Sequence, residues 1–180
     1  MSAMSKDQLN HFLRRPLIAR IATLLRDGSP TVIPIWYEWS PQSRTFLLWS
    51  RKGYGGLNSG WYDNLRREPR VALLVDESSE TKPKHDRVLA IGKAKTLPTP
   101  KNWLKLQLRM TERYIGKMKT RKYLEAMPRV PGGWVRVTPD RIITWTEAAG
   151  TNLWHQRYLR PGLRPVEQEK TPKRHWLKKT

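Results

Sequence analysis

The stretch that decides the fold is "PTVIPIWYEW", residues 30–39. β-Branched and aromatic side chains fill it, which is typical of a β-strand. It follows "ARIATLL" (19–25) and the turn "RDGSP" (26–30), in which Asp27-Gly28 supplies hairpin-turn residues. The flanks 19–25 and 31–39 therefore predict the two strands of a β-hairpin. Pro34 stands inside the second strand and cannot donate to a ladder. This position therefore indicates a bulge, a sheet edge, or a place where a ligand replaces a neighbouring strand.

Later segments continue this pattern of short strands separated by turns. Residues 61–67 predict a short helix stopped by Pro69. Residues 101–126 predict one longer helix, because Leu104, Leu108, Ile115 and Met118 recur on one face. The further predicted strands are "TFLLWS" (45–50), "RVALLVDE" (70–77), "RVLAIGKAKTL" (87–97) and a last strand pair in 133–147 around Pro139-Asp140.

These elements predict a mainly β (α+β) protein: a small barrel of about six mostly antiparallel strands, with short helices and one longer helix. At 180 residues the chain has the length of one domain. From Arg160 it becomes Pro-rich and basic. We therefore expect a folded domain over 1–159 and a flexible tail over 160–180.

The balance of charge is strongly positive, with 35 Lys and Arg against 15 Asp and Glu, a net charge of +20. Such a charge attracts nucleic acid, anionic lipid and small phosphorylated or polycarboxylate molecules, and it also serves solubility. Within 101–126, bases recur every fourth position at Lys101, Lys105, Arg109, Arg113 and Lys117. That stripe is interpreted as a solvated helix face or as a binding surface.

Several classes of chemistry are excluded or disfavoured. The chain has no Cys, which excludes disulfides, thiolate metal sites and Cys nucleophiles. Its four His residues are scattered, so we expect no metal site. There is no Walker loop, no G-x-S-x-G elbow and no G-x-G-x-x-G after a strand. No apolar run approaches a membrane span and no secretory signal is evident, so we expect a cytoplasmic protein.

A barrel with bases at strand ends and aromatic side chains along the strands suits a planar, phosphorylated aromatic ligand. It equally suits a nucleic-acid binder that stacks bases on exposed Trp and Tyr. Composition does not separate the two interpretations.

The order of five pieces carries a resemblance to a known family. They are "RIATL" with its D-G turn, the strand with a mid-strand Pro, the strand ending at Ser50-Arg51-Lys52, the helix "NLRREP" (64–69) before the next strand, and "RVLAIGKAKTL" followed later by "PDRIITWTEAAGTNLWHQRYL" (139–159). Over roughly residues 9–160 this order resembles the pyridoxamine 5'-phosphate oxidase-like family, the FMN-binding split β-barrels.

The resemblance implies a cofactor site at a homodimer interface. Residues 33–38 would run beside the isoalloxazine ring, Arg51 and Lys52 would bind the FMN phosphate, and Arg87 would stand where the oxidase has a Gln. The implied cofactor contacts are Ile33, Pro34, Ile35, Trp36, Ser50, Arg51, Lys52, Arg87, Trp145 and Arg157, and His155 is the implied substrate contact.

Three departures from the family pattern argue against vitamin B6 oxidation. Glu38 stands where the vitamin-oxidising enzymes have a Lys. Residues 109–127 contain no match to the family's Tyr/Arg/Ser substrate cluster. The Gly-rich segment 53–60 is an apparent insertion directly after the phosphate pair.

We therefore expect an FMN-dependent oxidoreductase, with hydride transfer at flavin N5 and a small-molecule substrate or nicotinamide donor. The alternatives are a deazaflavin-dependent reductase whose cofactor tail follows the basic stripe, a non-catalytic flavin- or haem-binding protein, and a basic nucleic-acid-binding protein. No catalytic residue or proton donor is assigned.

Overall fold

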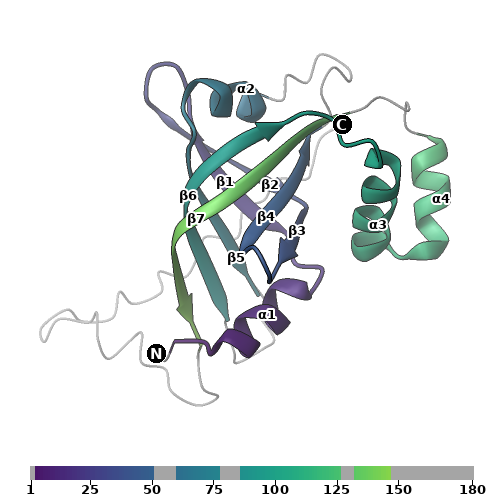
Figure 1. Cartoon of the computed structure of the whole chain (residues 1–180), viewed down its shortest axis with the longest axis horizontal. Helices are drawn as coiled ribbons and strands as arrows, with labels where there is room; N and C mark the ends of the chain where they lie inside the picture. Colours follow the sequence, from purple (N-terminus) through teal and green to yellow (C-terminus); the bar gives the residue numbers. More distant parts are fainter. Residues whose placement is uncertain (1–2, 51–59, 78–85, 127–131, 147–180) are drawn as a thin grey trace, which may run out of the picture. The chain divides into compact units, whose positions relative to one another are not determined.

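Seven strands form one antiparallel sheet in this computed structural model, which describes residues 3–50, 60–77, 86–126 and 132–146. All of these lie in the compact unit Met1–Ala149. The strand order is β2-β1-β5-β6-β7-β4-β3 (Figure 1). The strands are β1 (Ala19–Leu24), β2 (Pro30–Ile35), β3 (Tyr37–Ser40), β4 (Thr45–Ser50), β5 (Arg70–Asp76), β6 (Arg87–Leu97) and β7 (Gly133–Trp145).

The two edge strands of this sheet, β2 and β3, are consecutive in the chain and are joined by Trp36 alone. β2 pairs with β1 at one edge, and β3 pairs with β4 at the other. A single residue therefore connects the two edges, which makes the curled sheet a split barrel and confirms the predicted fold class. The prediction of one strand over 31–39 was wrong, and the count is seven strands rather than six. Pro34 lies in an edge strand, where a missing N–H is tolerated.

The last predicted strand pair is instead one 13-residue strand, β7, which runs beside β6 (Figure 1). Ile91 pairs with Arg141 and Gly92 with Pro139, so Asp140 is the extra residue of a β-bulge. The predicted turn at Pro139-Asp140 was therefore wrong. Gly92 makes the bulge possible, because a Cβ there would lie 2.7 Å from Pro139 Cα and 2.9 Å from Asp140 N.

Two helices complete the barrel core. α1 (Lys6–Arg14) was not predicted, although Ser5 and Gln8 form the capping box that marks its start. It buries Leu9, Phe12 and Leu13. α2 (Gly60–Arg67) agrees with the prediction and buries Trp61 and Leu65. Inside the barrel, apolar residues of every strand alternate with more exposed ones; the fully buried members include Ile21, Phe46, Leu48, Leu73, Val75, Val88, Val135 and Val137.

The predicted longer helix is two helices, α3 (Trp103–Ile115) and α4 (Lys117–Glu125). Gly116 separates them with φ +78° and ψ 158°, a conformation open essentially to glycine alone. The predicted apolar face is not the buried one: Leu104, Leu108 and Met118 are exposed, whereas Gln107, Met110 and Thr111 are buried. Within the described part of the chain, every helix is too short or too polar to span a bilayer.

Candidate functional site

A pocket of about 330 Å³ opens beside the junction of β2 and β3. Its walls come from the end of β2, the end of β4, and helices α2, α3 and α4. None of the described residues that line it is charged; they are Ile18, Ile33, Pro34, Ile35, Trp36, Trp49, Trp61, Met110 and Tyr123. All four residues predicted from segment 33–36 thus line one cavity, whose apolar and aromatic walls suit a flat, uncharged ring.

Trp36 is fixed by the helices that follow β6. Its indole stacks on the ring of Tyr114 in α3, with the ring centroids 4.8 Å apart and the planes 2° from parallel. The ring of Tyr123 in α4 lies 6.0 Å away at a tilt of 40°. Stacked aromatic pairs add about 0.5–1.5 kcal/mol beyond the burial of their area. The α3–α4 pair therefore sets the position of one wall of the pocket.

The hydroxyl of Tyr114 holds the backbone on both sides of this wall. It accepts a hydrogen bond from the Tyr37 N–H at 3.0 Å and lies 3.1 Å from the carbonyl oxygens of Leu17 and Tyr37, to one of which it donates. Burial raises the pKa of Tyr114, which keeps its hydroxyl protonated and able to donate. Tyr114 thus ties α3 to the first residue of β3 and to the segment before β1.

Arg113 has a structural role that its place in the basic stripe did not predict. Its guanidinium donates to the carbonyl oxygens of Tyr37 at 3.0 Å, Leu13 at 2.7 Å and Arg15 at 2.6 Å, and lies 4.8 Å from the centre of the Tyr37 ring. Arg109, one turn earlier, pairs with Glu38 at 2.7 Å. The stripe is therefore not a continuous solvated face, because Arg113 is half-buried; Lys101, Lys105, Arg109 and Lys117 are its exposed members.

Trp49 lines the pocket, and its indole N–H is a buried hydrogen-bond donor. Its Nε1–H is buried and has no acceptor among the described residues, which costs about 1–3 kcal/mol for a group of this kind. Ser50, the next residue, ends β4 and pairs with Gly133. The predicted phosphate ligands Arg51 and Lys52 follow directly in sequence and lie outside the described residues. The pocket therefore borders the strand end from which that pair continues.

Arg87 and Trp145 are brought together elsewhere. They are cross-strand partners where β6 begins and β7 ends, and neither lines the pocket. Both remain partly exposed, and Val88, the residue after Arg87, is buried in the barrel. The structure thus separates the predicted site into two groups of residues. His155 and Arg157 lie outside the described residues.

Sequence reasoning missed five of the residues that build this site: Trp49, Trp61, Arg113, Tyr114 and Tyr123. For Trp49 a signal existed, because it directly precedes the predicted phosphate-binding run. For Arg113 and Tyr114 none did, since their partners are backbone groups about 75 to 100 residues away in sequence.

Solved structures share this fold. A conserved hypothetical protein from Mycobacterium tuberculosis has 24% identity and a TM-score of 0.62, with 79% of this chain and 84% of that chain covered. An FAD-binding protein from Mesorhizobium loti has 20% identity and a TM-score of 0.56, with coverage of 82% and 98%. An F420 reductase has 20% identity and a TM-score of 0.52, with coverage of 74% and 94%.

No curated protein is significantly similar to the chain in sequence. The family model described as pyridoxamine 5'-phosphate oxidase, in contrast, matches residues 5–146. That range includes all seven strands of the split barrel and every residue that lines the pocket. The chain belongs to the pyridoxamine 5'-phosphate oxidase family.

Proposed function

We propose that this protein is a flavin-dependent oxidoreductase that binds FMN in sites shared between the two chains of a homodimer. Flavin binding in this family and fold is supported by the family match and by neighbours that include an FAD-binding protein. FMN, when bound, supplies a hydride acceptor at N5. The contribution of the protein is to bind the ring, hold the phosphate and provide charge beside the ring.

The pocket fits the ring of such a cofactor. Its volume lies at the lower end of the range of small-molecule sites, and its lining is aromatic and aliphatic. The buried Nε1–H of Trp49 is a donor for which a ring nitrogen or carbonyl oxygen is a suitable acceptor. Because none of the described residues that line the cavity is charged, we place the phosphate beyond them. The run Ser50-Arg51-Lys52 at the end of β4 has the donors for it.

The homodimer proposal rests on one observation: the two groups of predicted site residues lie at opposite ends of β7. Ser50 pairs with Gly133, the first residue of that strand, and Arg87 pairs with Trp145, the last. A strand of 13 residues spans roughly 40 Å at about 3.3 Å per residue. A single flavin mononucleotide is much shorter. We therefore assign the two groups that contact one cofactor to two different chains.

A surface for the second chain is present on the outside of the barrel next to Arg87 and Trp145. Leu74, Leu89 and Ile143 are cross-strand neighbours that remain partly exposed. In a twofold-symmetric dimer each chain presents the same patch, so Arg87 and Trp145 of one chain would approach the pocket of the other.

In this arrangement Arg87 is the candidate for electrostatic catalysis. A guanidinium beside the ring stabilises the negative charge that arrives with a hydride. No described side chain of the pocket can donate a proton at neutral pH except the hydroxyl of Tyr123. Glu38, which replaces the family's substrate-binding Lys, is neutralised by Arg109. We therefore propose a substrate other than a vitamin B6 phosphate.

The structure gives less support to the two alternative cofactors. A deazaflavin with a polyglutamate tail was attractive because of the continuous basic stripe, but Arg109 and Arg113 are engaged with Glu38 and with backbone carbonyls. Because an F420 reductase is among the solved structures with a similar fold, a deazaflavin is one possible result of the cofactor identification described below. A haem requires an axial ligand, and no His lines the described pocket; Met110 is its single sulfur group.

The first experiment is to identify the cofactor of the purified protein by its visible absorbance spectrum and by mass spectrometry of the released chromophore. We expect FMN that is bleached anaerobically by a nicotinamide donor. Bound flavin that no donor reduces would support a non-catalytic carrier. A released deazaflavin or haem would overturn the FMN assignment.

The shared site is tested by complementation. One variant carries Arg51→Ala and Lys52→Ala, and the other carries Arg87→Ala and Trp145→Ala; each alone should lose FMN binding. After mixing, unfolding and refolding, half of the dimers are mixed and one of their two sites is intact. About a quarter of the FMN sites should therefore return. A mixture that binds no more FMN than its components would overturn the two-chain site.

A further inference from the structure

We propose that one end of the outer surface of β5, β6 and β7, the end away from Arg87 and Trp145, binds the sugar-phosphate backbone of nucleic acid. The surface, called here the basic face, consists of Arg70, Lys93, Lys95, Arg136 and Arg141, and all five are exposed. None of these residues belongs to the proposed flavin site, so this proposal does not rest on the proposed function. The net charge of +20 gives it a favourable background.

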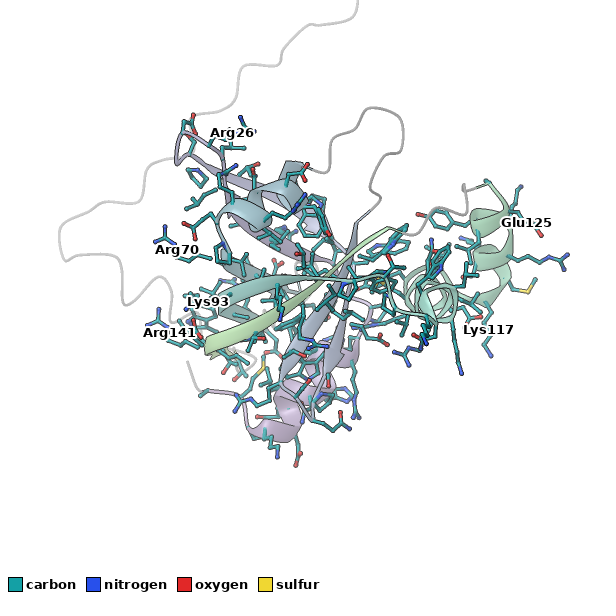
Figure 2. The ribbon with its side chains drawn as sticks, turned by 45° about the horizontal axis from the view of Figure 1, so that its top comes forward. Arg26, Arg70, Lys93, Lys117, Glu125 and Arg141 are labelled. Carbon is teal, nitrogen blue, oxygen red and sulfur yellow. The ribbon has the colours of Figure 1, made fainter. Side chains whose placement is uncertain are left out.

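Strand alternation points these side chains to one surface. Lys93 and Lys95 flank the buried Ala94 on β6, and Arg136 stands between the buried Val135 and Val137 on β7. Figure 2 shows Arg70, Lys93 and Arg141 projecting from the same side of the sheet. The basic face is therefore a fixed array on three adjacent strands, in contrast to charges on a flexible segment.

The pairing register places like charges directly opposite each other twice. Arg70 is the cross-strand partner of Lys93, and Lys95 is the cross-strand partner of Arg136. Directly opposed like charges destabilise a sheet. A solvated face gains nothing from this arrangement. A bound polyanion relieves both repulsions at once, which is a physical reason for a partner.

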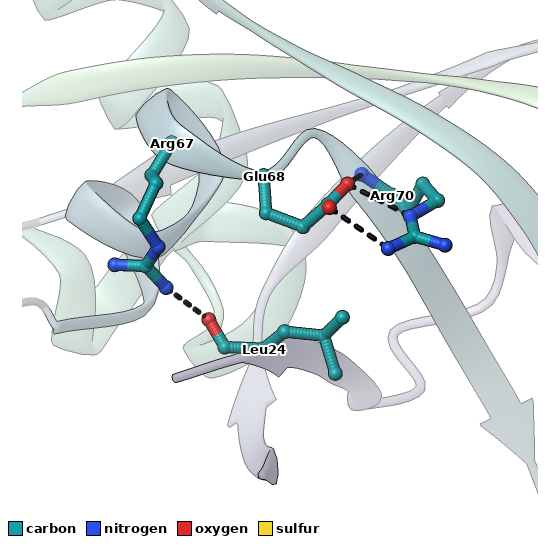
Figure 3. A network of polar contacts seen from close by, with 4 residues as sticks. All are labelled: Leu24, Arg67, Glu68 and Arg70. Carbon is teal, nitrogen blue, oxygen red and sulfur yellow. Dashed lines mark hydrogen bonds and ion pairs between the residues drawn. The ribbon is translucent and has the colours of Figure 1, made fainter. Parts of the chain in front are cut away.

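Few carboxylates compensate these charges. Glu68 binds Arg70 through two contacts of 2.9 Å, and the guanidinium holds the pKa of Glu68 at about 2 (Figure 3). This pair orients Arg70 and cancels its charge in part. Asp140, at the bulge, is the other acid next to the array. The other four bases of the face are Lys93, Lys95, Arg136 and Arg141. Together with Asp140 they carry a net charge of +3.

A groove of about 410 Å³ runs beside the array. Arg70, Lys93 and Asp140 stand at it, and small side chains, among them Ala22, Ala72 and Gly92, form its floor. Arg67 stands close by, but its guanidinium donates to the carbonyl oxygen of Leu24 at 2.5 Å (Figure 3). The shallow floor gives a backbone room to approach the bases without a clash.

The spacing and composition favour nucleic acid over a small anion or a lipid surface. Residues two apart on a strand, such as Lys93 and Lys95, are about 6.6 Å apart. Phosphates two steps apart on one duplex strand are separated by about 6.8 Å along the helix axis. An array over three strands exceeds what one small anion can use. The partly exposed Leu74, Leu89, Ile143 and Trp145 of these strands lie toward the other end, near Arg87, and are not part of the basic face. Binding should therefore be independent of base sequence.

The test is fluorescence anisotropy of a short labelled DNA duplex, measured against salt with the full chain. The face variant combines Lys93→Gln, Lys95→Gln and Arg136→Gln. The control variant combines Lys101→Gln, Lys105→Gln and Lys117→Gln, which removes the same charge from the helices. We expect the wild type and the control to bind with similar salt slopes. The face variant should lose at least about tenfold in affinity, and its slope should fall by about 0.9 for each lost contact.

Three results would overturn the proposal: no binding of wild type to the duplex at physiological salt, equal losses in both variants, or binding to phosphatidylserine vesicles that depends on the face while duplex binding does not. Circular dichroism and thermal unfolding check the fold of each variant. If the face variant fails to fold, a charge-preserving variant, Lys93→Arg with Lys95→Arg, must keep binding while the single Lys95→Gln weakens it. Loss in the former or no change in the latter contradicts the proposal.

Discussion

The indole of Trp36 and the ring of Tyr114 lie parallel, with their centroids 4.8 Å apart. The two residues are far apart in sequence: Tyr37, which follows Trp36, is 77 positions from Tyr114. Trp36 is the single residue between β2 and β3, where the two edges of the sheet meet. α3 thus holds the junction that makes the barrel a split barrel, and with it one wall of the pocket. The packing of the pocket and the stability of the fold are coupled through this pair.

Replacing Tyr114 by Phe should lower the free energy of unfolding by about 1–3 kcal/mol. The ring would still stack on Trp36, but the Tyr37 N–H would lose its acceptor. Tyr37→Phe is the matched control, because the Tyr37 hydroxyl makes no well-formed hydrogen bond in the described structure. Urea unfolding of both variants measures the difference. Equal losses in the two variants would contradict the role given to the Tyr114 hydroxyl.

Stability should fall at alkaline pH. Burial raises the pKa of both Tyr37 and Tyr114 above the ordinary value. The folded state therefore binds these protons more tightly than the unfolded state does. Their contribution is fully present below about pH 10 and is lost as the pH rises toward the folded-state values. Urea unfolding from about pH 8 to about pH 11 should show this decline, and it should be smaller in Tyr114→Phe. A flat profile would count against the burial of these hydroxyls.

Two arginines one turn apart on α3 should differ widely in their effect on stability. Arg113→Gln leaves carbonyl oxygens of Leu13, Arg15 and Tyr37 without their shared donor and should cost more than about 2 kcal/mol. Arg109→Gln breaks the ion pair with Glu38. Because the Arg109 side chain is 61% exposed, the loss should lower the free energy of unfolding by less than about 1 kcal/mol. Thermal and urea unfolding report both. A similar cost at the two positions would mean that Arg113 is a surface residue.

Gly92→Ala should destabilise the protein by about 1–3 kcal/mol or prevent its folding, because the new Cβ would meet the backbone of Thr138, Pro139 and Asp140 at the bulge. Gly60→Ala is the control, since the equivalent Cβ would meet nothing within 4 Å. The comparison needs only the expression level and the melting temperature of each variant. A tolerated alanine at position 92 would mean that the bulge is absent or can shift.

Trp49→Phe should separate cofactor binding from stability. Phenylalanine keeps an aromatic wall but removes the buried Nε1–H, which has no acceptor in the described structure. If that donor serves the flavin, the Kd for FMN should rise about tenfold, the equivalent of one hydrogen bond, while the free energy of unfolding without FMN stays the same or rises. Flavin fluorescence titration provides the Kd. An unchanged Kd would remove Trp49 from the donors of the site.

The sequence by itself determined most of the strands and the fold class. The runs of β-branched and apolar residues in 19–25, 70–77 and 87–97 are local signals, so β1, β5 and β6 agree closely with their predictions. The ordered motifs were sufficient to identify the family resemblance. They also grouped residues 33–36, which the pocket does bring together.

Only the tertiary structure decided the roles of single side chains on helices and the connections of the barrel. Arg109 and Arg113 look alike at a spacing of four residues, but one reaches Glu38 and the other reaches three carbonyls of distant segments. The break at Trp36, the bulge at Asp140 and the partners of the basic face depend on which strands become neighbours. Helical and strand periods report which side of an element is apolar. Pairing between segments far apart in sequence depends on the whole sheet, and no local pattern contains it.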